Sequence, residues 1–282
     1  MTRTVAIVTD STSYLPTELA AENDIVKVPV AVIIGDKPYN EGIDISTAEV
    51  AQALREWRPV TTSRPTPAQM LKAYEEAAAK GYTSVVSVHL SSSLSGTYDS
   101  ARIAATESPI PVTVVDSRTI AMAMGFACLS GAEVANNGAT TEEVARVIEG
   151  RALASSVFFY VDTLEYLRRG GRVSAFSAAI GNMLRVKPIL YMKDGIVEFL
   201  EKTRTATKAT QRIADLALEA AGGQPVDFSV QQLDAAERAN ALEALLKQAS
   251  PDSNIIPSEI GAVVGTHGGP GLCAVVVAPR SW

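Results

Sequence analysis

Cysteine and histidine are scarce in this chain of 282 residues, which has two of each. Cys128 and Cys273 lie far apart and neither belongs to a CxxC pair, so we expect two buried thiols and no disulfide or zinc site. No group of His, Cys, Asp and Glu has the spacing of a metal centre. We therefore expect neither a metal nor a cofactor.

Long apolar runs and an excess of basic charge are also missing. No apolar run approaches the roughly 18 residues that a bilayer-spanning helix needs. The first four residues lead directly into a predicted strand without the apolar segment of a signal peptide, so we expect a cytoplasmic protein. A formal net charge of −6 argues against nucleic acid as the main partner.

The first half of the chain has the pattern of a parallel α/β sheet. Apolar runs at 4–9, 25–34, 85–90 and 112–115 predict strands, the second interrupted by Pro29. Helical segments separate them, and polar residues follow each strand, which is typical of a sheet that binds ligands beyond its carboxyl ends. Residues 61–67, which contain two prolines, are expected to form a rigid connection between two helices. Ser46 or Thr47 is expected to cap the first of these helices, at 48–57.

The pattern changes after residue 156. Asp194-Gly195 predicts a hairpin turn between two apolar segments, which places antiparallel strands in this part. We therefore predict two α/β domains, 1–156 with a parallel sheet and 157–282 with a mixed sheet. A helical segment is expected over 163–183 and a strand over 260–264.

Hydroxyl groups gather where the strand at 85–90 gives way to a helix. Four serines, Gly96 and Thr97 occupy the turn in the stretch SVVSVHLSSSLSGTYDSA, residues 84–101. A helix N-terminus has free N–H groups and partial positive charge, so this turn could hold a carboxylate or a phosphate, or could simply cap the helix.

The two histidines have different surroundings. His267 lies in the glycine-rich segment GTHGGPG, where the backbone and the imidazole could approach a ligand. The same segment is also consistent with a histidine that is hydrogen-bonded within a tight turn. His89 lies within an apolar strand and is expected to be a hydrogen-bonded core histidine.

Common catalytic motifs are absent from the sequence. It contains no GxxxxGK[ST] phosphate loop, no GxGxxG after a strand and no GxSxG nucleophile turn. A serine hydrolase that uses Ser93 or Ser95 with His267 remains an alternative. Without an evident acid, base or metal partner, the hydroxyls of Thr62, Ser93 and Ser95 suit the binding of an anion better than the breaking of a bond.

Basic residues are concentrated after residue 162. The segment DTLEYLRRGGR at 162–172 is followed by further cations, namely Arg185, Lys187, Lys193, Lys202, Arg204 and Lys208. This density is either an ordinary solvated surface or a docking patch for an acidic partner or a phosphate-bearing ligand.

Several motifs in order along nearly the whole chain carry a family resemblance. They are VTDSTSYLP, EGIDIS, TTSRPTP, LSSSLSGTYDSA, VVDSRTIAMAMG, DTLEYLRRGGRVS, VKPIL and GTHGGPG. With them the chain resembles the DegV family of bacterial fatty-acid-binding proteins, acyl carriers that work with a separate fatty acid kinase. The resemblance implies two α/β domains with one long acyl chain buried between them and its carboxyl group hydrogen-bonded at one end.

The resemblance also implies roles for individual residues. The side chains that would hold the carboxyl group are Thr62, His267 and Ser95, with Ser93 as the alternative serine. Arg172 corresponds to an arginine near the head group, and Arg204 to one on the surface that docks the kinase. One departure is Arg64, where the family commonly has glutamine, and this extra cation either alters carboxylate binding or faces solvent.

The resemblance predicts a carrier that performs no chemistry itself. It would present a bound fatty acid to the kinase and pass acyl phosphate to phospholipid synthesis, with transient contact with a membrane allowed. Two other functions stay open at this point. One is a serine esterase or thioesterase that uses Ser95 and His267, and the other is a regulatory module whose lipid is only structural.

Overall fold

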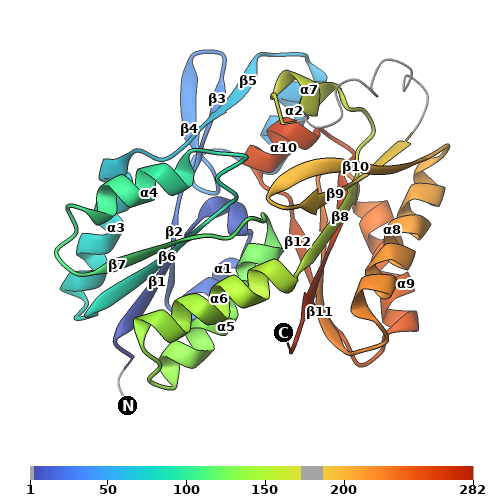
Figure 1. Ribbon diagram of the computed structural model, residues 1–282. Coiled ribbons are helices and arrows are strands. Elements are labelled where there is room, and N and C mark those ends of the chain that lie inside the picture. The colour runs from blue at the N-terminus through green and yellow to red at the C-terminus, as the bar shows by residue number, and fades with distance from the viewer. Residues whose placement is uncertain (1–2, 173–186, 282) are drawn as a thin grey trace.

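A parallel sheet with the strand order β2-β1-β6-β7 forms the first part of the molecule (Figure 1). The computed structural model describes residues 3–172 and 187–281. Every residue of β1 and β6 is buried, as the apolar runs predict for strands that are covered on both faces. The strands are β1 (Val5–Asp10), β2 (Ile25–Val28), β6 (Ser84–His89) and β7 (Val112–Asp116).

Helices cover both faces of this sheet. Side chains alternate along β1, so that Ala6 and Val8 join the core under α3 and α4, while Val5 and Ile7 join the core under α5 and α6. The prediction of a parallel α/β sheet in this part is therefore confirmed. The helices are α1 (Thr17–Glu22), α3 (Pro67–Ala79), α4 (Thr97–Ala105), α5 (Met122–Asn136) and α6 (Thr141–Ala154), and a 3₁₀ turn η1 (Ser11–Ser13) follows β1.

A small antiparallel sheet of order β4-β3-β5 lies beside the parallel one. The segment 25–34 forms two strands in two sheets, because Pro29 lacks the N–H group that a continuous ladder needs. The segment 61–67 is not only a connection, since its first residues belong to β5, where Thr62 pairs with Val32 of β3. The strands are β3 (Ala31–Ile34), β4 (Lys37–Asn40) and β5 (Val60–Ser63).

Helix α2 (Thr47–Arg55) connects β4 to β5. Ser46 caps it, as predicted, in a capping box with Glu49. Val50 and Leu54 of this helix are buried in one cluster with residues of β3 and of helix α10 (Ala262–Gly268).

A six-stranded mixed sheet of order β10-β9-β8-β13-β11-β12 forms the second part, as predicted. β11 and β12 are parallel, and the other pairs are antiparallel. The predicted hairpin turn at Asp194-Gly195 joins β9 to β10. The strands are β8 (Ser156–Tyr160), β9 (Lys187–Lys193), β10 (Ile196–Thr203), β11 (Val226–Gln232), β12 (Asn254–Glu259) and β13 (Cys273–Pro279).

The two faces of the mixed sheet have different neighbours (Figure 1). Helices α8 (Ala206–Ala221) and α9 (Ala236–Ala249) cover one face, where Ile213 and Leu242 are fully buried. The other face meets α5 and α6, and buried residues of β8 and β13 belong to the same core as those helices. The predicted division between residues 156 and 157 falls at the start of β8. Because this core contains residues from both sides of that position, the domain division stays a prediction.

The predicted strand at 260–264 is wrong, since helix α10 (Ala262–Gly268) begins there. Two adjacent valines and an isoleucine favour a strand locally, but the first N–H groups of the helix find acceptors in the N-terminal part of the chain, and this tertiary contact decides the outcome. Of the helical segment predicted over 163–183, α7 (Glu165–Arg169) is observed, and residues 173–186 lie outside the described part. Among the described residues, no helix is both long enough and apolar enough to cross a membrane.

Candidate functional site

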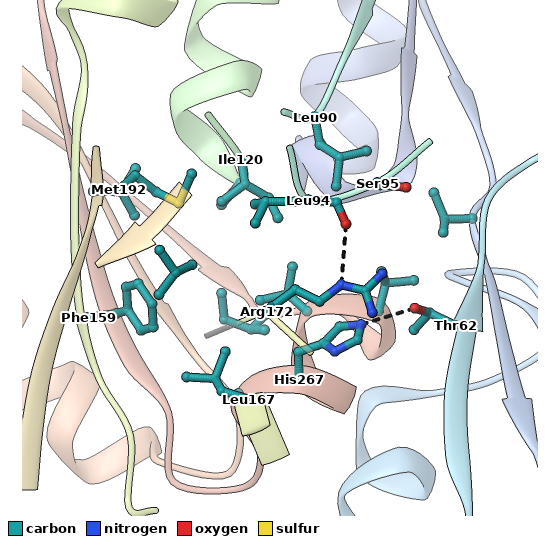
Figure 2. Close-up of a pocket in the computed structure, with 18 of the residues that line it drawn as sticks. Thr62, Leu90, Leu94, Ser95, Ile120, Phe159, Leu167, Arg172, Met192 and His267 are labelled. Atoms are coloured by element: carbon teal, nitrogen blue, oxygen red, sulfur yellow. Dashed lines mark hydrogen bonds between the residues drawn. The ribbon is translucent and has the colours of Figure 1, made fainter. Parts of the chain in front are cut away.

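A cavity of about 400 Å³ lies between the parallel sheet and the mixed sheet. Most of its wall is hydrocarbon from both parts of the chain, and Figure 2 shows Phe159 and Met192 at one end. Apolar lining residues include Leu90, Leu94, Ile120, Val157, Phe159, Leu167, Met192, Val197, Val263 and Leu272. A wall of this composition suits an apolar ligand, because burying its carbon surface is favourable.

Polar side chains gather at the other end of the cavity (Figure 2). Thr62 comes from β5 and His267 from α10, and a hydrogen bond of 3.0 Å joins Thr62 Oγ1 to His267 Nε2. Arg172 follows α7, and Ser95 precedes α4. The structure thus brings together four residues that the sequence singles out in separate motifs, and all four line the cavity.

His267 is held closely by its neighbours. Gly170 lies against the imidazole, and a Cβ atom added to this glycine would stand 2.1 Å from Nδ1. Nδ1 itself is buried and has no hydrogen-bond partner among the described residues. A buried ring nitrogen without a partner is costly, so the packing of Gly170 holds the imidazole in a place where hydrogen bonding alone would not.

The electrostatics of this end keep His267 neutral. Burial is the main cause, and the charge of Arg172 the second, of a pKa of His267 that falls from 6.5 to about 4. A neutral imidazole carries one N–H donor and one acceptor, so with Thr62 it can orient a carboxyl group without forming an ion pair.

Arg172 supplies the fixed charge of this end. Its Nε donates to the carbonyl oxygen of Leu94 at 3.3 Å, and its Nη1 donates to that of Gly170. Burial lowers the pKa of the guanidinium, yet an arginine side chain stays protonated in proteins. The two carbonyl contacts fix the cation beside His267.

The two candidate serines occupy different places. Ser95 lines the cavity, and its Oγ lies 2.9 Å from Thr97 Oγ1 and accepts the backbone N–H of Thr97 at 3.3 Å. Ser93 is exposed, stands near Gly195 of the β9–β10 turn, and is not among the described residues that line the cavity. The geometry favours Ser95 as the contact for a ligand.

Glu41, in the motif EGIDIS, contributes to the site although the sequence gives it no role. Its buried carboxylate accepts the N–H of Val263 at 2.8 Å, the hydroxyl of Tyr14 at 3.3 Å and the hydroxyl of Ser11. Tyr14 in turn accepts the N–H of Val264 at 3.1 Å. These bonds hold the start of α10, the helix that carries His267 in its last turn. The signal that the sequence gave for this role was an acidic residue inside the motif EGIDIS.

Burial dominates the titration of Glu41. Removal from water raises the pKa of this carboxyl from 4.5 to about 7, although hydrogen bonds from Ser11 and Val263 favour the charged form. The nearby charge of Asp10 acts in the same direction as burial. The carboxyl therefore changes its protonation near neutral pH.

The hydrolase alternative needs a serine hydrogen-bonded to a histidine. Within the part of the chain that the structure describes, Ser95 bonds to Thr97 and His267 to Thr62, so the two are not paired with each other. His89 does contact a serine and an aspartate, with Nε2 2.8 Å from Ser87 Oγ and Nδ1 3.0 Å from Asp10 Oδ2. All three are fully buried, which confirms the prediction of a satisfied core histidine.

The family model of the DegV family, a family of uncharacterised proteins, matches residues 4–280. The chain belongs to the DegV family. A DegV domain-containing protein of Streptomyces coelicolor is 50% identical to it over 281 residues, which make up 99% of this chain and 100% of that protein. The family recognised from the motifs is confirmed.

Solved structures of DegV family proteins have the same fold. DegV of Bacillus subtilis, described as a fatty acid binding protein, is 34% identical and superposes with a TM-score of 0.91 over 99% of this chain and 100% of that one. A DegV family protein of Thermus thermophilus, described for its fatty acid binding, is 33% identical with a TM-score of 0.91, covering 98% and 99% of the two chains.

Two further arginines of this DegV chain lie at different distances from the polar end. Arg64 lines the cavity and is exposed, and its Nη1 donates to the carbonyl oxygen of Gly96 at 3.3 Å. Arg204 is exposed between β10 and α8 and is not among the described residues that line the cavity. Arg185 lies outside the described residues. Among the described residues, no group of three or more acidic, His or Cys side chains could hold a metal ion.

Proposed function

We propose that this DegV protein binds one long-chain fatty acid, with its carboxyl group at Thr62, Ser95 and His267. The observation that carries the proposal is the form of the cavity, which is apolar along most of its wall and has hydroxyl and imidazole groups at one end. Its volume of about 400 Å³ lies in the range of small-molecule sites, roughly 300–1,000 Å³. The fatty-acid-binding DegV proteins of Bacillus subtilis and Thermus thermophilus support it.

The two ends of the ligand would contribute differently to binding. Burial of about 14 methylene groups at about 0.8 kcal/mol each gives on the order of 10 kcal/mol before the costs of ordering and association are subtracted. A carboxylate loses hydration on burial and needs several hydrogen-bond donors in return. We therefore assign affinity to the acyl chain and orientation to the polar end.

The proposal extends to a cytoplasmic carrier that works with a fatty acid kinase and performs no catalysis of its own. A carboxylate oxygen of the bound fatty acid would attack the γ-phosphorus of ATP on the kinase, the bond to ADP would break, and an acyl phosphate would form. Arg172 would lie beside the reacting group, and Arg204 would contact the kinase. The product would enter phospholipid synthesis, with transient membrane contact during loading or release.

Lipid analysis of the purified protein tests the binding function directly. Mass spectrometry of small molecules released by denaturation should find about one fatty acid per chain. The variant Ile120→Trp, which fills the cavity, should lose this lipid, while Ile103→Trp should keep it, because Ile103 is exposed on α4. A protein that stays free of lipid after incubation with a panel of fatty acids would contradict the proposal.

A further inference from the structure

A second pocket, also of about 400 Å³, lies behind the polar end of the lipid cavity. Thr62, Arg172 and His267 line both pockets and so form the wall between them. The remaining lining comes mainly from the segment that leads into β5 and from α7. We call this second space the outer pocket.

The outer pocket is strongly basic. Arg58, Arg169 and Arg172 line it, and none of its described lining residues is an aspartate or a glutamate. In a chain with a formal net charge of −6 such a grouping is local. Glu165 is not among the lining residues, and it accepts from Arg169 at 2.7 Å and from Arg168 at 2.8 Å. One carboxylate shared by two arginines leaves the pocket with a net positive charge.

An aromatic pair holds one of these arginines in place. The rings of Trp57 and Tyr166 are stacked, with centroids 6.0 Å apart and an interplanar angle of 18°. The guanidinium carbon of Arg169 lies 4.6 Å from the centre of the Trp57 ring. Trp57 is 58% exposed although it is large and apolar, and its backbone has a φ of 57°, which costs free energy in a residue other than glycine.

A basic pocket with oriented guanidinium groups is suited to a phosphoryl group. Arginine presents planar N–H groups that can bind two oxygens at once, and a phosphoryl group offers up to three. Because Thr62 and His267 line both pockets, a carboxyl group bound at these residues lies next to the outer pocket, and a phosphoryl group attached to it would enter that pocket past their side chains.

We propose that the outer pocket binds the phosphoryl group of an acyl phosphate whose acyl chain occupies the lipid cavity. Arg58 and Arg169 would contact the phosphoryl oxygens from the solvent side and Arg172 from the wall. The inference rests on the proposed function, and it gives Arg169 and Arg172 of the basic segment after residue 162 a specific ligand.

Calorimetry with two ligands of equal chain length tests the inference. Palmitate and a non-hydrolysable phosphonate analogue of palmitoyl phosphate are titrated into delipidated protein. In the double variant Arg58→Ala/Arg169→Ala, the affinity for the phosphonate should fall at least tenfold, as the loss of charged hydrogen bonds implies, while the affinity for palmitate should change less than twofold. Arg168→Ala is the matched control, because Arg168 shares Glu165 but does not line the pocket.

The outcomes separate this inference from the function on which it rests. If palmitate binds and the double variant keeps the phosphonate affinity, or if the control loses as much, the outer pocket is not a phosphoryl site although the carrier function stands. If the wild type binds neither ligand, both fail. Should the double variant bind inorganic phosphate or ATP less tightly but the phosphonate equally well, the pocket serves a free anion and the acyl phosphate assignment is wrong.

The single variant Arg58→Gln replaces the double variant if the latter does not fold. We expect it to lose at least threefold in affinity for the phosphonate, and an unchanged affinity would overturn the inference.

Discussion

The neutral state of His267 links the site to pH. Burial, with the charge of Arg172 second, lowers its pKa from 6.5 to about 4, whereas the unfolded chain binds this proton near pH 6.5. The stability that depends on a neutral His267 is present above pH 6.5 and is lost as the pH falls towards 4, by about 3 kcal/mol. Glu41 acts in the opposite direction, because its raised pKa makes its contribution decrease between pH 4.5 and about 7.

We expect a comparison with His267→Gln to isolate the histidine. Urea unfolding of the ligand-free proteins at pH 7.5, 5.5 and 4.5 gives the free energy of unfolding of each. The stability of the wild type relative to the variant should decrease by about 2 to 3 kcal/mol from pH 7.5 to pH 4.5. A difference that does not change with pH would show that His267 is not held neutral by its surroundings.

Ser95 and Ser93 form a natural pair for testing the carboxyl site. Ser95→Ala should weaken palmitate binding about tenfold, because it removes one hydrogen bond to a charged group. Ser93→Ala should leave the affinity unchanged, since Ser93 is exposed and Ser95 lines the cavity. Calorimetric titration of both variants checks this, and an equal loss in both would place the carboxyl group elsewhere on the serine turn.

At the scale of elements, α10 depends on a carboxylate from another part of the chain. In Glu41→Ala the N–H of Val263 would be buried without a partner, so we expect a loss of about 2 to 3 kcal/mol of stability and weaker palmitate binding through a displaced His267. Glu41→Gln should restore much of both, because its amide oxygen can accept the same bond. Glu49→Ala, which removes the exposed capping-box carboxylate of α2, is the control and should not change palmitate affinity.

Unfolding and binding curves of these variants distinguish positioning from stability alone. If Glu41→Ala is destabilised yet binds palmitate as tightly as the wild type, α10 does not need this carboxylate to place His267. If Glu41→Gln behaves like the alanine variant, the negative charge matters more than the hydrogen bond.

The elements also show what local sequence can predict. Strands β1 and β6 follow from uninterrupted apolar runs, and the family motifs identify Thr62 and His267 before their contact is seen. Helix α10 could not be predicted, because its valines favour a strand and the bonds from Glu41 and Tyr14 come from more than 220 residues away in the chain. The sequence alone also did not show that Arg58 and Arg169 share a pocket with His267, because only the fold brings the segment before β5 next to α7.

At the scale of the whole molecule, the cavity exists only where the two sheets meet. Its wall takes Leu90 and Ile120 from the first part of the chain and Phe159 and Met192 from the second, and one core runs through both. Neither half alone would therefore enclose an acyl chain. Arg204 follows β10 in the second part, exposed and outside the cavity lining, so loading and docking should be separable.

Arg204→Ala is expected to impair the kinase reaction while lipid loading stays normal. The exposed guanidinium contributes nothing to the wall of the cavity, so palmitate affinity should match the wild type, whereas loss of one interface cation should slow acyl phosphate formation about tenfold. Lys208→Ala is a matched control, because Lys208 is an exposed cation four residues further along the chain, in the first turn of α8. Production of acyl phosphate by a fatty acid kinase is measured with palmitate-loaded protein at several carrier concentrations, and the defect should lie mainly in the Michaelis constant for the carrier.

Two outcomes would contradict this assignment. Reduced loading with normal turnover would assign Arg204 to lipid binding. A loaded wild-type protein that supports no acyl phosphate formation would leave its lipid a structural or regulatory role.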